Sequence, residues 1–226
     1  MNNRSLIFEK DTLERSNRIF WQSLLDHIRK DVQGRPVNTI LDVGCHEGGL
    51  LEKLASTFHP LELIGIEPVI EFRERTRFRL RPLNPKARIL PPENWFEVSE
   101  RSVDLLTCHE VLHLLEDLTE FFVNIERVLC NYGSAFVVSG CHTDNPAWEY
   151  WSKQLRNSGQ VVFNRTPFEI INQAIEAGLQ CEFRPLRRDG WIIFDPEKSW
   201  SKFTSINTLI DHQYRNKLLF RLSRRV

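Results

Sequence analysis

The sequence predicts a three-layer α/β fold in which helices cover both faces of a doubly wound, parallel sheet. Short apolar runs of strand length alternate with segments whose apolar residues recur at helical spacing. The apolar run over 40–43 also stops at Gly44, and a helix-like pattern starts near Glu47. A buried strand that enters a glycine turn and then a helix is the first half of a βαβ unit.

Composition is that of one ordinary domain, so residues 1–226 are expected to form a single unit. Apolar residues make up 41% and the formal net charge is zero, so no global field attracts nucleic acid or a membrane. No apolar run approaches the ~18 residues that cross a bilayer, and the N-terminus lacks the apolar core of a signal peptide. Five cysteines without Cys-x-x-Cys spacing suit reduced thiols, so we expect a cytoplasmic location without membrane contact.

The first half of the chain predicts helices and strands in alternation. Residues 8–32 have apolar side chains at helical spacing, and Gly34 helps to end that helix. After the glycine turn, one helical stripe should face the sheet, formed by Leu50, Leu51, Leu54 and Phe58. A second apolar run over 61–67 predicts the next strand.

The segment after that strand should be a helix, because Pro68 suits a helix start and Pro82 a helix end. Arginine recurs at every second position from Arg73 to Arg81. On a strand these like charges would share one face at a cost, whereas a helix spreads them around its surface. We expect them to be mainly solvated. A patch for a phosphorylated or nucleic-acid substrate is the alternative.

Later strands and helices follow from the same periodicities. Short apolar runs predict strands over 87–90, 103–107 and 135–139, with an amphipathic helix over 114–129. The stretch Thr166-Pro-Phe-Glu169 has the N-cap, proline and acid that open a helix.

Toward the C-terminus, two strand-like runs over 180–186 and 191–195 flank an Asp-Gly pair that ends at Gly190. An Asp-Gly pair between two such runs predicts a β-hairpin. Residues Phe203 to Leu222 then have the apolar spacing of a terminal amphipathic helix.

Four stretches resemble motifs of class I S-adenosylmethionine-dependent methyltransferases. Leu41-Asp-Val-Gly-Cys-His-Glu-Gly-Gly49 and Ile64-Gly-Ile-Glu-Pro68 are similar to the first two motifs. The stretch 102–115 resembles the fourth strand and its following loop, and 128–138 resembles the glycine turn and fifth strand. The resemblance spans residues 36–195. It implies a mostly parallel, seven-stranded sheet with a reversed C-terminal strand.

The resemblance also implies how the rest of the chain is organised. Residues 1–35 would form an N-terminal helical cap over the cofactor cleft, although a helix packed on one edge of the sheet is the alternative. Residues 141–165 lie where the family covers its substrate, and residues 197–226 would be a C-terminal helical extension. Aromatic residues in the cover, Trp148, Tyr150 and Trp151, suit a flat or apolar acceptor, and helix packing explains them almost as well.

A nucleoside-containing cofactor is expected at the glycine turn. Gly44 and Gly48 allow a ligand to lie against bare backbone, and Glu67 at a strand end can accept hydrogen bonds from both ribose hydroxyls. The resemblance makes this cofactor S-adenosyl-L-methionine and places Glu93 or Asn94 near its adenine. The expected cofactor contacts are Asp42, Gly44, Cys45, His46, Gly48, Glu67, Pro68, Glu93, Asn94, Trp95 and Cys108.

Two details of that site are open. The family usually has a second glycine where this chain has His46. Trp95 could stack on the adenine base, and a polar loop with a packed tryptophan is the alternative.

Cys-His pairs follow three predicted strands, at Cys45-His46, Cys108-His109 and Cys141-His142, with His113 one helical turn beyond His109. Chance is one explanation. Another is that a histidine takes a proton from, or orients, the methylated group, and the candidates are His109, His113 and His142. The third is a metal site, which small-RNA 2′-O-methyltransferases of this fold build from Glu and His ligands. Glu110 and His113 match that arrangement only in part, so no metal is expected.

The predicted activity is methyl transfer from S-adenosyl-L-methionine to a small-molecule acceptor, by O- or N-methylation. An RNA or tRNA methyltransferase is the enzymatic alternative, and a non-catalytic S-adenosylmethionine-binding protein of the same fold is the third reading. A nicotinamide-dependent dehydrogenase would need Gly-x-Gly-x-x-Gly, whereas this turn reads Gly-x-x-x-Gly-Gly. The acceptor and the oligomeric state do not follow from the sequence.

Overall fold

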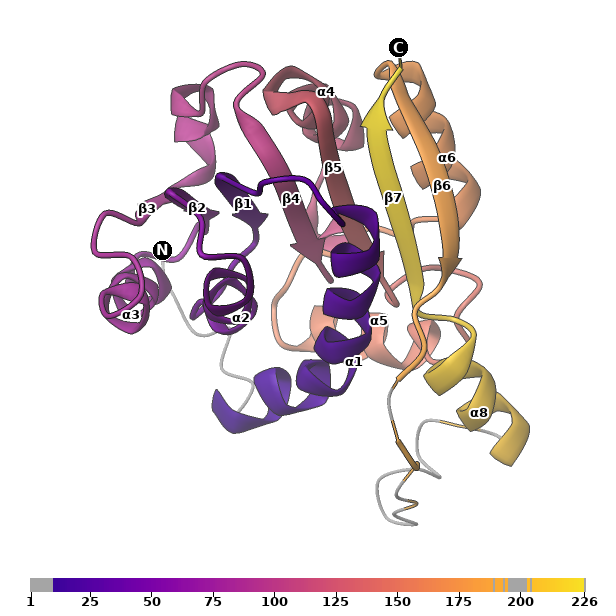
Figure 1. The fold of residues 1–226 in the computed structure, drawn as a ribbon. Helices are drawn as coiled ribbons and strands as arrows, with labels where there is room; N and C mark the ends of the chain where they lie inside the picture. Colours follow the sequence, from indigo (N-terminus) through magenta and orange to yellow (C-terminus); the bar gives the residue numbers. More distant parts are fainter. Residues whose placement is uncertain (1–9, 189, 193, 195–202, 204, 226) are drawn as a thin grey trace.

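The computed structural model describes residues 10–188, 190–192, 194, 203 and 205–225. Its centre is a seven-stranded sheet with the strand order β3-β2-β1-β4-β5-β7-β6 (Figure 1). The strands are β1 Thr39–Val43, β2 Glu62–Ile66, β3 Arg88–Leu90, β4 Val103–His109, β5 Leu129–Ser139, β6 Leu179–Pro185 and β7 Leu218–Arg224. The neighbouring strands β3, β2, β1, β4 and β5 pair in parallel, whereas β7 is antiparallel to both of its neighbours, β5 and β6. The predicted mostly parallel sheet with a reversed C-terminal strand is confirmed.

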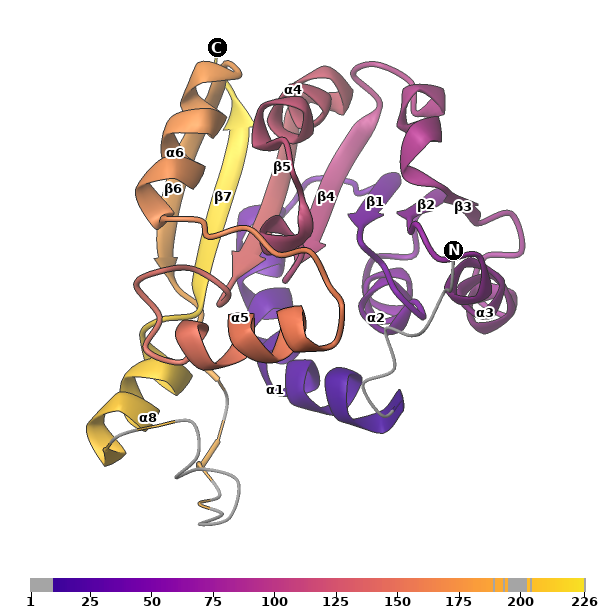
Figure 2. The same cartoon turned by 180° about the vertical axis from the view of Figure 1, so that it is seen from behind.

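Helices cover both faces of the sheet, as Figures 1 and 2 show from opposite sides. They are α1 Lys10–Asp31, α2 Gly49–Phe58, α3 Ile70–Leu80, α4 Leu118–Val128, α5 Trp148–Asn157, α6 Pro167–Glu176 and α8 Ile206–Tyr214, with the 3-10 turns η1 Pro92–Glu97 and η2 Leu112–Leu114. Helices α1 and α2 cover one face, and α4 and α6 cover the other. The three-layer prediction is therefore confirmed.

The core is divided by the sheet into two clusters, and β1 contributes to both. Ile40 packs with Leu24 of α1 and Leu51 of α2, whereas its neighbour Leu41 packs with Phe122 of α4. Successive strand residues point to opposite faces, so a strand that is covered on both sides must be apolar throughout. Each such side chain contributes about 1.5–3 kcal/mol by leaving water. This burial fixes the carboxyl ends of β1, β4 and β5 side by side.

The C-terminal part of the fold differs from the sequence-based prediction. Strand β6 does not form a hairpin with residues 191–195, since it pairs with β7. Described residues within 191–195 are not in a strand, and residues 193 and 195 lie outside the described structure. The predicted terminal helix ends at Tyr214, and β7 inserts between β5 and β6. The predicted helical extension over 197–226 is wrong for its second half, and residues 197–202, 204 and 226 are not described.

Smaller differences concern the bounds of single elements. Helix α4 starts at Leu118, because the Asp117 side chain caps it by accepting the N–H groups of Thr119 and Glu120. Strand β5 starts ten residues before Ser139 and carries a register irregularity beside β4. Among the described residues, no helix combines the length and apolar character needed to span a membrane.

Candidate functional site

The turn between β1 and α2 holds three residues in the left-handed backbone region. Gly44 has φ 74°, His46 has φ 50°, and Gly48, the N-cap of α2, has φ 79°. The Gly44 N–H donates to the carbonyl oxygen of Ile66 at 2.8 Å, which ties the turn to the end of β2. A side chain in this region costs about 1–2 kcal/mol, which explains why the resembled family favours glycine at the position of His46.

Glu67 fastens the turn from the end of β2. One carboxylate oxygen accepts the N–H of His46 and the other accepts the N–H of Val69, both at 2.9 Å. The Thr76 hydroxyl donates to the His46 carbonyl oxygen at 2.7 Å, and the His46 ring lies 4.1 Å from the ring of Phe72. Burial raises the pKa of the Glu67 carboxyl, while the two N–H donors work against that rise. Each oxygen keeps a lone pair with which it can accept a ligand hydroxyl.

Asp42 lies beneath the turn. It is 2% exposed, and one of its oxygens accepts the hydroxyl hydrogen of Thr107 on the neighbouring strand β4 at 2.6 Å. Burial raises the pKa of Asp42 to about 7, and the charge of Glu67 adds to this. Asp42 thus links β1 to β4 below the predicted cofactor.

The chain's own side chains already contact the glycines of the turn. A Cβ atom on Gly44 would overlap the side chain of Val111. On Gly49 it would lie 2.8 Å from the Trp21 ring and 2.9 Å from the Glu14 carboxyl carbon, both from α1. Helix α1 therefore packs directly on the β1–α2 turn, and its role as a cap over a cofactor stays a prediction.

Several predicted cofactor residues turn their side chains into the core. Cys45 is 5% exposed and Cys108 is fully buried, so only their backbone atoms could meet a ligand. Burial raises the pKa of both thiols. Trp95 packs edge-on against Phe121 with ring centroids 5.9 Å apart, which corrects the stacking prediction in favour of the packed-tryptophan alternative.

The remaining candidates near the adenine position lie at the ends of β2 and β3. Glu93 is exposed on η1, and the Asn94 amide donates to the Glu97 carboxylate. Pro68 is exposed, and its carbonyl oxygen accepts a hydrogen bond from Arg73. Glu93 and Pro68 are thus both exposed, whereas Asn94 is half-buried.

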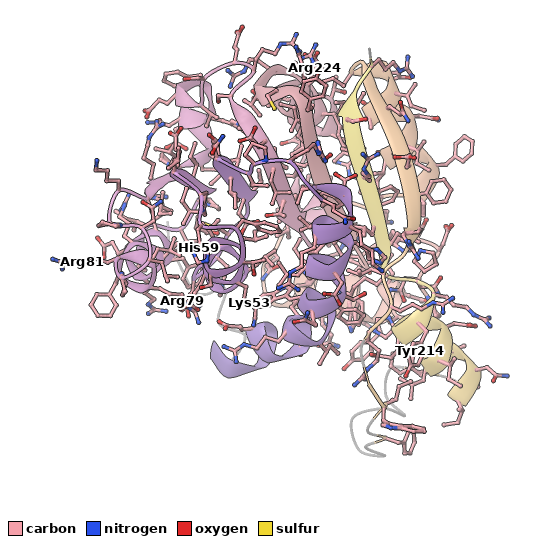
Figure 3. All side chains as sticks on the ribbon, in the orientation of Figure 1. Lys53, His59, Arg79, Arg81, Tyr214 and Arg224 are labelled. Carbon is pink, nitrogen blue, oxygen red and sulfur yellow. The ribbon has the colours of Figure 1, made fainter. Side chains whose placement is uncertain are left out.

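The alternating arginines lie on α3 as predicted, but most of them are not simply solvated. Four bind protein groups: Arg73 the Glu67 and Pro68 carbonyls, Arg75 the Glu47 carboxylate, Arg77 the Ile89 carbonyl, and Arg79 both the Glu47 carbonyl and the Glu14 carboxylate. Arg81 points away from the fold (Figure 3). The run serves chiefly to hold α3 against the cofactor turn and α1.

The three candidate histidines lie at the carboxyl ends of β4 and β5. His109 ends β4 and meets Trp21 edge-on at 6.4 Å, and His113 in η2 meets Trp148 of α5 at 5.6 Å. His142 follows β5, and its Nε2 lies 2.6 Å from the Asn216 carbonyl oxygen. Within the described structure, His109 Nε2, His113 Nδ1 and His142 Nδ1 are buried without a hydrogen-bond partner.

Burial keeps these imidazoles neutral. It lowers the pKa of His109 to about 3 and that of His113 to about 4, and it lowers the pKa of His142 as well. Neutral imidazoles can donate and accept hydrogen bonds at the same time, which suits orientation of a polar substrate group.

One charged pair at this edge did not follow from the sequence. The Glu110 carboxylate is ion-paired with the Lys217 ammonium, and both side chains are largely buried. Lys217 lies just before β7, in a segment that helical spacing assigned to the terminal helix. Glu110 itself has φ 59°, and strained residues of this kind often mark functional sites.

Comparison with known proteins agrees with this description. Residues 41–135 match the family model described as "Methyltransferase domain". No curated protein sequence matches the chain significantly. The fold is the one seen in class I S-adenosylmethionine-dependent methyltransferases, and the family model matches less than half of the chain. The resemblance seen in the sequence is thus confirmed at the level of the fold.

Solved structures match most of the chain at low identity. A chain from the complex between the Haloferax volcanii Trm112 methyltransferase activator and a methyltransferase has a TM-score of 0.75 at 15% identity, covering 94% of this chain and 93% of that chain. Geranyl diphosphate C-methyltransferase from Streptomyces coelicolor, solved with Mg²⁺, geranyl diphosphate and S-adenosyl-L-homocysteine, has a TM-score of 0.70 at 17% identity. The match covers 94% of this chain and 80% of that chain. A geranyl diphosphate methyltransferase solved with S-adenosylmethionine has a TM-score of 0.66 at 17% identity, and the match covers 90% of this chain and 85% of that chain. S-adenosylmethionine is the cofactor of this class.

Proposed function

We propose that the chain binds S-adenosyl-L-methionine at the β1–α2 turn and transfers its methyl group to a small-molecule acceptor, by O- or N-methylation. The observation that carries this proposal is the arrangement of Glu67, which locks the turn through the His46 N–H yet keeps acceptor capacity on both oxygens. Unpartnered buried nitrogens at Trp21 and His109, beside the same turn, also fit a polar ligand. A cytoplasmic location is part of the same proposal.

Each group in the site has a proposed task. Bound S-adenosylmethionine supplies a methyl group already activated by its sulfonium charge, so the protein mainly contributes proximity and alignment. Glu67 binds the ribose hydroxyls, and the backbone of Gly44 and Gly48 borders the methionine portion. Glu93 or Asn94 is placed near the adenine amino group.

The histidines and the cover complete the acceptor side. His109, His113 and His142 hold the acceptor by hydrogen bonds from their unpartnered nitrogens. Residues 141–165 cover it, and residues 1–35 cap the cofactor, with Trp21 packed on Gly49. This cap excludes water from the transfer.

An RNA acceptor has less support. The arginine run that suggested it is mostly committed to contacts within the chain, which leaves Arg81 as its member without a described partner. Nucleic-acid binding depends on cations that are free to neutralise phosphates. We therefore keep the small-molecule acceptor.

Calorimetric titration with S-adenosylmethionine and S-adenosylhomocysteine tests the proposal. Hydrogen bonds to a charged group contribute about 1.5–3 kcal/mol, so Glu67→Ala should weaken binding by ~10- to 100-fold. Thr76→Val is the matched control, because it loosens the same His46 peptide from its other side without removing the carboxylate. It should weaken binding by less than ~10-fold, the range of one neutral hydrogen bond.

The outcomes separate two failures. Unchanged affinity in folded Glu67→Ala removes Glu67 from the site. Absence of binding to the wild-type chain removes the methyltransferase proposal as a whole.

A further inference from the structure

Three potential metal ligands meet at the carboxyl ends of β4 and β5. Glu110 follows β4, His113 lies in η2 and Cys141 follows β5, and one ligand atom from each lies within 4.8 Å of the others. His113 is 6% exposed, and its Nδ1 has no partner among the described residues. A buried nitrogen without a hydrogen bond is costly, so it calls for a ligand.

The backbone holds the carboxylate of this cluster in place. The Gly140 N–H donates to both Glu110 oxygens, at 3.0 and 2.9 Å. A Cβ atom at Gly140 would lie 2.9 Å from Glu110 Oε1, so only glycine allows the strand to come this close. Preorganisation of a ligand lowers the entropy that binding must overcome.

Lys217 is the cation that this cluster already contains. Its ammonium pairs with Glu110 Oε1 and also lies 4.4 Å from the centre of the Phe20 ring. Glu110 Oε2 accepts the Gly140 N–H, and the Cys141 thiol lies within hydrogen-bond reach of the same carboxylate. A carboxylate oxygen that accepts one N–H keeps a lone pair. A metal ion can therefore bind Oε2, but at a disadvantage from the nearby ammonium.

We propose that Glu110, His113 and Cys141 form a site for one thiophilic divalent cation of the zinc type. A thiolate, an imidazole and a carboxylate are the donors that such ions prefer, and three protein ligands leave a fourth position open. On binding, the Cys141 thiol loses its proton to solvent as the metal–sulfur bond forms. While the metal is bound, the His113 nitrogen is occupied, and His109 and His142 remain to hold the acceptor. This site goes beyond the proposed function, because metal binding needs neither S-adenosylmethionine nor an acceptor.

Titration of the full chain with Co²⁺ tests the site, since a cobalt–thiolate bond gives a charge-transfer absorption band. The wild-type chain should bind one Co²⁺ with this band, and Zn²⁺ should abolish it by competition. Cys141→Ser should lose the band. His113→Ala should weaken Co²⁺ binding by more than ~100-fold, because removing a residue that only positions a metal ligand already costs ~10- to 100-fold in affinity. Cys181→Ser on β6 is the matched control and should keep both the band and the affinity.

Lys217→Met gives a second, independent measurement. Removing the ammonium should strengthen Co²⁺ binding at least ~10-fold, because like charges this close repel strongly in a buried site. It also leaves Glu110 unpaired, so the thermal midpoint should fall without metal and recover when Zn²⁺ is added.

Two results would overturn the site: a folded wild-type chain that shows no cobalt–thiolate band, or a band that survives Cys141→Ser. The first result decides the matter even if Lys217→Met does not fold. Both results leave the S-adenosylmethionine titrations unaffected, so failure here is distinguishable from failure of the proposed function.

Discussion

The buried carboxyl of Asp42 makes a pH-dependent contribution to stability that one substitution should remove. Its pKa is about 7 in the folded chain against a reference value of 3.8, because burial disfavours the ionised form. Between these values the folded chain holds a proton that the unfolded chain has released. Stability therefore falls as pH rises through this window and stops falling above about pH 7.

The structure sets the size of the effect. The two pKa values differ by about three pH units, and each unit corresponds to ~1.4 kcal/mol, so the full contribution is about 4 kcal/mol. Asp42→Asn keeps an oxygen that accepts the Thr107 hydroxyl but cannot ionise. The Asn variant should thus gain about 3 kcal/mol relative to wild type between pH 5 and pH 8.

Urea unfolding of both proteins at several pH values measures this difference, and other titrating groups cancel because both chains share them. Asp26→Asn, on the exposed side of α1, is the matched control and should run parallel to wild type. A difference between Asp42→Asn and wild type that stays constant from pH 5 to pH 8 would refute the reasoning.

Three further substitutions test other parts of the structure. Gly44→Ala should lower the free energy of unfolding in urea by at least ~2 kcal/mol, because the position has φ 74° and the new side chain overlaps Val111. The double variant Gly44→Ala/Val111→Ala should recover part of this loss, and no recovery would contradict the overlap. Asp117→Ala should lower the unfolding free energy by ~1 kcal/mol by uncapping α4 while S-adenosylhomocysteine affinity stays unchanged, and Asp117→Ser should restore it. Trp21→Phe removes the part of the buried indole ring that packs on Gly49, so the unfolding free energy should fall by about 1–3 kcal/mol, and unchanged stability would contradict this packing.

Local signals were enough to predict the centre of the fold. The apolar run of β1, the glycine turn and the stripe on α2 each carry a signal within a few residues, and the structure confirms all three. The position of Glu67 followed from the same logic, because an acid at the end of a second strand must lie beside the first turn.

The C-terminal strand could not be identified in this way. Strand β7 is covered on both faces, so Leu219, Phe220 and Leu222 are all buried and the alternation that marks a half-buried strand is lost. A short apolar run of this kind is compatible with helix or strand. The Asp-Gly pair at Gly190 predicted a hairpin that does not form, because β6 pairs instead with β7, which is more deeply buried.

Polar contacts between residues far apart in the sequence could not be predicted either. Lys217 and Glu110 are separated by 107 positions, and nothing near either residue indicates the other. The same holds for the arginines of α3, whose partners lie on α1 and in the cofactor turn. Trp95 had two readings in the sequence, and only the packing of Phe121 decides between them.

The place of β7 between β5 and β6 has a consequence for synthesis of the chain on the ribosome. Until residues 218–224 have left the exit tunnel, the edge of β5 and the whole of β6 lack the strand that joins them. Open strand edges recruit other chains. Strands β5 and β6 are therefore open to pairing with another chain until β7 has formed, so the sheet is completed only by the strand that comes last in its sequence order.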